Sequence, residues 1–170
     1  MTAAGLLILR VVIGGILFGH GAQKVFGWWG GPGLAGWTQA MTRMRMRPPR
    51  AWALISALGE LGGGILLILG LLTPLACAAF AGSMLVAVML VHLPKGFWVS
   101  KGGYEFNLSI LGAIAALALI GPGTASLDSA LRIQLPEPAT LLVLTVAVIA
   151  GVAVALGWRT PAEAPKAETA

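Results

Sequence analysis

The sequence predicts an all-α integral membrane protein, a helical bundle with a four-helix core and a fifth, C-terminal transmembrane helix. Of its 170 residues, 58% are hydrophobic and only 10% are charged, whereas soluble domains carry about 25% charged residues. Five apolar runs approach the roughly 20 residues that a helix needs to cross the hydrocarbon core of a bilayer. So few charges leave too little polar surface to cover a water-soluble globule of this size.

Proline and glycine separate the five predicted spans, because neither residue continues a helix well. Pro74 opens the third span, Pro94 ends it, and Gly121-Pro122-Gly123 ends the fourth. The spans are expected over residues 3–20, 51–72, 75–93, 104–120 and 139–158. We expect the four-helix core within residues 1–128 and the additional helix within 129–159. Residues 160–170, rich in Ala, Pro, Lys and Glu, are expected to form a disordered cytoplasmic tail.

Basic residues gather on one side of the predicted topology. Five spans place the two termini on opposite sides, and only Arg132 falls in a loop on the N-terminal side. The other side receives Lys24, Arg43, Arg45, Arg47, Arg50, Lys95, Lys101, Arg159 and Lys166. Because positive charge is retained in the cytoplasm, the N-terminus is expected outside and the C-terminus inside, in a bacterial inner membrane. The six tryptophans fall near the same cytoplasmic boundary, as an aromatic belt would.

The net charge of +5 therefore indicates topology and contact with the lipid bilayer, not nucleic-acid binding. Cys77 is the single cysteine, so the chain cannot form an intrachain disulfide or a CxxC redox centre. The sequence also shows no haem, flavin or iron–sulfur motif. Electron chemistry would therefore depend on a partner.

Two charged residues fall inside the predicted membrane spans. Arg10 lies roughly 10 Å below the outer boundary and Glu60 roughly 14 Å from the inner one, at 1.5 Å per residue. A lone charge at such depth costs at least about 2.5–3.5 kcal/mol. We therefore expect an intramembrane ion pair between Arg10 and Glu60. It would either fix the register of the first two spans or belong to a polar site or proton relay.

A second polar cluster is predicted at the cytoplasmic ends of the spans. Its candidate ligand-binding residues are His20, Gln23, Lys24, His92, Tyr104 and Glu105. Such groups could bind a polar headgroup, for example a quinone carbonyl or a small anion. Interface anchoring and helix capping explain the same residues, because cations are favourable at helix C-termini. A metal site is not predicted, since the histidines and the carboxylate come from separate segments without HxxxH or ExxH spacing.

Four motifs in order resemble the DoxX family of bacterial membrane proteins. They are HGAQKVFGWWGGPG, ALGELGGGILLILGLLTPLA, MLVHLPKGFW and GGYEFNLSILGAIAALALIGPGTASLD, and the resemblance covers residues 6–128. It implies a four-helix membrane protein, to which the fifth span is an addition. A shared family site would fall on His20, Gln23, Lys24, Glu60, His92, Tyr104 and Glu105.

The resemblance implies association with redox systems. One relative is a membrane subunit of quinone-linked sulfur oxidation, and others are scaffolds joining a superoxide dismutase to a sulfurtransferase. The leading hypothesis is an accessory or scaffold subunit that holds a soluble oxidoreductase or sulfurtransferase at the cytoplasmic face. The alternative is a quinone-binding subunit of an oxidoreductase. A small-molecule transporter is a lesser alternative, because no paired Gly/Pro-broken spans mark a midplane site.

Overall fold

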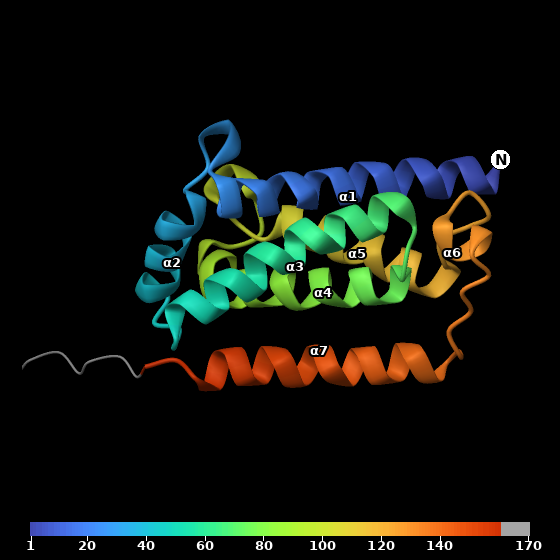
Figure 1. Ribbon diagram of the computed structural model, residues 1–170. Helices are drawn as coiled ribbons and strands as arrows, with labels where there is room; N and C mark the ends of the chain where they lie inside the picture. Colours follow the sequence, from blue (N-terminus) through green and yellow to red (C-terminus); the bar gives the residue numbers. More distant parts are fainter. Residues whose placement is uncertain (161–170) are drawn as a thin grey trace, which may run out of the picture.

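Five helices run back and forth along a common axis in the computed structural model, which describes residues 1–160 (Figure 1). They are α1 (Thr2–Phe26), α3 (Pro49–Leu69), α4 (Thr73–Ala87), α5 (Glu105–Ile120) and α7 (Ala139–Gly157). Short helices α2 (Gly33–Arg43) and α6 (Leu127–Ala130) lie at opposite ends of the bundle. The fold prediction of an all-α membrane bundle is confirmed. The predicted tail lies, apart from Thr160, outside the described residues.

Within residues 1–160, four helices are long and apolar enough to cross a membrane: α1, α3, α7, and α4 with its extension to Lys95. That extension consists of a π-helical turn, Val88–His92, and a 3-10 turn, Leu93–Lys95. The predicted fourth span is a shorter helix, α5, whose 16 residues span about 24 Å. A further 3-10 turn, Val99–Lys101, leads into it.

The segment expected to be a loop after the first span is largely helical. Helix α1 continues six residues beyond the predicted end at His20 and stops at Gly27, whose φ of 74° forms a left-handed cap. A 3-10 turn, Trp28–Gly30, and helix α2 follow. Together they place Trp37, expected in the aromatic belt, against the side chains of Lys24 and Ser56.

Close packing of α1 against α3 depends on small residues. A Cβ atom on Gly14 would lie 2.8 Å from Ile68 Cγ1, and one on Gly64 would lie 2.6 Å from Phe18 N. Glycine at these two positions lets the helix backbones approach closely, as membrane helices commonly do. The glycine-rich run in the second span is thus a helix-packing surface.

The hydrophobic core lies between α1, α3, α4 and α5. Phe80, Leu17, Leu67 and Leu117 have no exposed surface. Helix α7 packs mainly along α4, outside this core, and only Ala155 of that helix is fully buried (Figure 1). The end of the bundle that holds α2 and the C-terminal end of α7 carries the basic loops, and we call it the basic end.

Candidate functional site

A buried carboxylate, Glu60, lies near the basic end with two side-chain partners. Its side chain is 1% exposed; Lys24 of α1 donates to Oε2, and Ser83 of α4 donates to Oε1. The three residues come from three helices. They form a charged, hydrogen-bonded site inside the bundle.

The predicted pairing of Arg10 with Glu60 is therefore wrong, and the helix register explains why. Helices α1 and α3 are antiparallel, and the contact of Gly64 with Phe18 sets residue 60 beside the last turns of α1. The prediction ended the first span at His20, whereas α1 continues to Phe26 and keeps Lys24 on the helix at the level of Glu60.

Arg10 is buried at the opposite end, where α1, α3 and the segment before α6 meet. Its guanidinium donates to the backbone carbonyls of Ala125 and of Ile68, the latter at 3.4 Å. Nearby Asp128 accepts three hydrogen bonds from the α3–α4 turn, from Leu72 N at 2.8 Å and from Thr73 N and Oγ1 at 3.1 Å. These contacts join helix ends, so Arg10 has a structural position away from Glu60.

Trp37 of α2 covers the charged pair from one side. The Lys24 ammonium lies 4.4 Å from the centre of the Trp37 ring, within the range of a cation–π interaction. Trp37 Nε1 donates to Ser56 Oγ of α3 at 2.8 Å, which orients the ring. Helix α2 thus contributes directly to the site, although the sequence suggested a loop there.

A cavity of about 1060 Å³ adjoins the charged pair. Its wall includes residues from α1, α2, α3, α4, α5 and α7, most of them apolar. Its polar side chains are those of His20, Lys24, Trp37, Arg43, Trp52, Ser56, Glu60, Ser83, His92, Lys95 and Asn107. A concave, mainly apolar space with a few polar groups is the usual character of a small-molecule site, and the volume of this one is slightly above the usual range of roughly 300–1,000 Å³.

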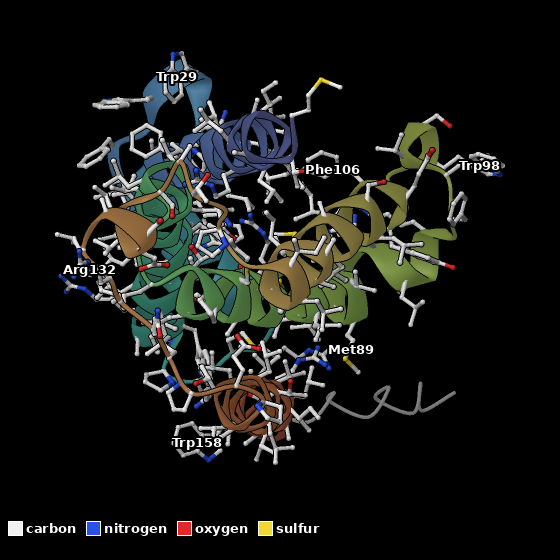
Figure 2. All side chains as sticks on the ribbon, turned by 90° about the vertical axis from the view of Figure 1, so that its right-hand side faces the viewer. Trp29, Met89, Trp98, Phe106, Arg132 and Trp158 are labelled. Atoms are coloured by element: carbon white, nitrogen blue, oxygen red, sulfur yellow. The ribbon has the colours of Figure 1, made fainter. Side chains whose placement is uncertain are left out.

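The structure brings three of the six predicted ligand-binding residues to this cavity: His20, Lys24 and His92. The ring centroids of His20 and Phe106 are 6.2 Å apart, and Figure 2 shows Phe106 beside α1 and α5. His92 Nδ1 is 2.7 Å from the carbonyl of Gly102, so its ring is held by the loop that follows.

The other three predicted residues have local contacts. Glu105 accepts a hydrogen bond from Val99 N at 2.9 Å, at the first turn of α5. The Tyr104 ring packs edge-on against Phe97, with centroids 5.6 Å apart. A Cβ atom on Gly31 would lie 2.5 Å from Cβ of Gln23, so the backbone of the loop after α1 packs closely against Gln23. Helix capping and packing account for these positions.

Sequence reasoning missed Trp37, Ser56 and Ser83 as site residues. A buried carboxylate needs hydrogen-bond donors, and Ser83 is the one hydroxyl within the apolar run from Leu75 to Leu93. That requirement was a usable signal. Trp37 was expected only as part of an aromatic belt, and Figure 2 shows Trp29, Trp98 and Trp158 pointing outward in that manner.

A family model described as DoxX matches residues 5–93. The chain belongs to the DoxX family. The match includes α1 to α4 and hence Lys24, Glu60 and Ser83, whereas α5 and α7 lie beyond it.

Two relatives extend this comparison. The chain is 33% identical over 124 residues to "Putative oxidoreductase CatD" of Bacillus subtilis (strain 168), covering 73% of this chain and 84% of that protein. It is 32% identical over 128 residues to "Inner membrane protein YqjF" of Escherichia coli (strain K12), covering 75% of this chain and 92% of that protein. No solved structure matches the chain significantly.

Proposed function

We propose that this DoxX protein is a redox-associated membrane subunit that binds a quinone in the cavity beside Lys24, Glu60 and Ser83. The observation that carries the proposal is a charged, hydrogen-bonded group in the wall of a large, mainly apolar cavity. A quinone needs this combination, because its ring carries polar oxygens and its substituents are apolar. The name of the B. subtilis relative, an oxidoreductase, agrees with a redox role.

Lys24 and Glu60 retain hydrogen-bonding capacity for such a ligand. A lysine ammonium has three N–H donors, of which Glu60 uses one. A carboxylate offers about four acceptor positions, of which Lys24 and Ser83 occupy two. Lys24 can therefore donate to a quinone carbonyl, and Glu60 can accept from a quinol hydroxyl, without breaking the existing pair.

The electrons would come from a soluble oxidoreductase at the basic end, which we propose faces the cytoplasm. Reduction of a quinone to a quinol consumes two electrons and two protons. In this proposal the partner supplies the electrons and the chain supplies the binding site. The protons reach the ring from the side of the basic end, where Lys24, His20 and His92 line the cavity.

The proposal is tested by quinone binding to the purified protein in detergent, using tailless ubiquinone-0 as the probe. Ser83→Ala removes one donor to Glu60 and leaves the Lys24 contact in place. We expect binding to weaken about tenfold, the equivalent of about 1.4 kcal/mol. Ser109→Ala is the matched control, since Ser109 bonds its own helix at the Glu105 carbonyl, and it should bind as the wild type does. Equal binding by both variants, or none by the wild type, would contradict the proposal.

A scaffold role without quinone chemistry is the second candidate, and the basic end favours it. Arg43, Arg45, Arg47 and Arg50 are all exposed, as are Lys95 and Lys101. Such a surface fits an acidic partner protein or anionic lipid. If scaffolding is the function, replacing Arg43, Arg45 and Arg50 by glutamate should release a co-purifying oxidoreductase or sulfurtransferase, whereas Ser83→Ala should not.

A further inference from the structure

We infer that the part of the cavity between α4 and α7 is a groove for the apolar tail of the quinone. The inference rests on the proposed function and extends it, because it assigns the tail of the ligand to a helix outside the matched family region. It would make α7 one wall of the binding site.

On α4, Ser83 is the one polar residue of the cavity wall, and an apolar stretch leads from it toward the end remote from the basic end. The lining residues of α4 begin at Leu75, near the end remote from the basic end, and reach Ser83 at the charged pair. Eight residues of helix separate these two positions, which is roughly 12 Å. Every α4 residue that lines the cavity before Ser83 is apolar: Leu75, Ala78, Ala79 and Gly82.

Helix α7 supplies an apolar wall along this stretch. It runs in the same direction as α4 and lies beside it (Figure 1). All of its lining residues are apolar: Leu144, Ala147, Val148, Gly151, Val152 and Ala155. A ligand whose polar ring lies at Ser83 would therefore meet only apolar side chains between α4 and α7.

Gly82 shows that helix packing does not fill this stretch. A Cβ atom at Gly82 would meet no atom within 4 Å, in contrast to the close contacts at Gly14 and Gly64. Gly82 lies in the cavity wall beside Ser83, so this open space adjoins the charged pair. Gly59 and Gly151, which also line the cavity, likewise have no atom within 4 Å of an added Cβ atom.

The groove runs along α4. Ser83 lies near the middle of the span Thr73–Lys95, so the polar ring would lie at that depth and the tail would run toward Leu75, away from the basic end. An acyl chain of a phospholipid has the same apolar chemistry, so the test must separate ring binding from tail binding.

The experiment compares two probes on the full-length protein in detergent: decylubiquinone, which carries a tail, and ubiquinone-0, which does not. Gly82→Leu places a side chain in the groove, starting from a Cβ atom that meets no other atom within 4 Å. We expect it to weaken decylubiquinone binding about tenfold, because the leucine side chain displaces about two tail methylenes from the apolar wall. Ubiquinone-0 binding should change less than about twofold.

Gly112→Leu is the matched control, because Gly112 lies within α5, has equally open surroundings and is outside the cavity wall. Val148→Phe narrows the groove from α7 and serves if Gly82→Leu does not fold, with folding checked by thermal unfolding. Wild-type binding of decylubiquinone by the groove variants would overturn the tail groove and leave the quinone site standing. If the groove variants lost binding of both probes equally, the tail groove would also be overturned, because the quinone ring would then occupy this space. No binding of either probe by the wild type would overturn the proposed function, and the groove with it.

Discussion

Replacing Lys24 by methionine should destabilise the protein strongly, because it leaves a buried charge without its counter-ion. Glu60 is 1% exposed and the Lys24 side chain 16% exposed. After the substitution, Ser83 is the one remaining side-chain donor to the carboxylate among the contacts described. Removing one partner of a buried pair typically costs about 3–5 kcal/mol. The cost of a lone charge in a membrane span, at least about 2.5–3.5 kcal/mol, is of the same size.

The double variant Lys24→Met/Glu60→Gln separates charge from packing. It removes the unpaired charge and keeps an acceptor for Ser83, so most of the lost stability should return. The free energy of unfolding of the double variant should remain about 0.5–2 kcal/mol below that of the wild type. The double variant, like Lys24→Met, lacks the interaction of Lys24 with Trp37. Lys101→Met, at an exposed lysine, is the control and should change stability by less than about 0.5 kcal/mol.

Cys77 provides the assay. It is the single thiol in the sequence and is 3% exposed in α4, so it reacts with a maleimide dye only when the bundle opens. The free energy of unfolding is measured by titrating SDS into detergent micelles and following the labelling. If Lys24→Met were within about 1 kcal/mol of the wild type, the reasoning from a buried pair would be refuted. It would also be refuted if the double variant were less stable than the single one.

Three further predictions use the same unfolding assay. Gly64→Ala should cost about 1–3 kcal/mol, because the added methyl group collides with the backbone of α1 at Phe18, and an unchanged stability would contradict the close packing. Asp128→Ala should cost about 2–4 kcal/mol by removing three hydrogen bonds to the α3–α4 turn, and it should leave ubiquinone-0 binding unchanged in the folded fraction. Trp37→Phe should cost about 1 kcal/mol through the lost bond to Ser56, and it should weaken ubiquinone-0 binding, which a purely structural role for the ring would not do.

The fold class was predictable because hydrophobicity along a membrane chain is a strong, local signal. Long apolar runs, Pro94 and Gly121 marked the helix ends closely, and Gly64 indicated tight helix packing. Helix α2 was missed for a physical reason. It begins with glycine and ends with arginine, as a surface loop can, and its helical state depends on packing against α3.

Pairing inside the bundle was much harder to predict, because it depends on helix register. An error of six residues in the end of α1 moved Lys24 off the helix and left Arg10 as the apparent partner of Glu60. Membrane depth alone cannot identify partners on helices of uncertain length. The prediction that Glu60 must be paired was sound, since its charge required a counter-ion, and only the identity of that counter-ion needed the structure.

The most direct test of the quinone site is photolabelling with an azido-substituted quinone, followed by mass-spectrometric mapping of the labelled residues. We predict that label falls on α1 near His20, on α4 near Ser83, or on both, and that excess ubiquinone-0 suppresses it. Label confined to residues outside the cavity wall, such as the exposed face of α5 around Gly112, would contradict the account. So would labelling that ubiquinone-0 does not suppress.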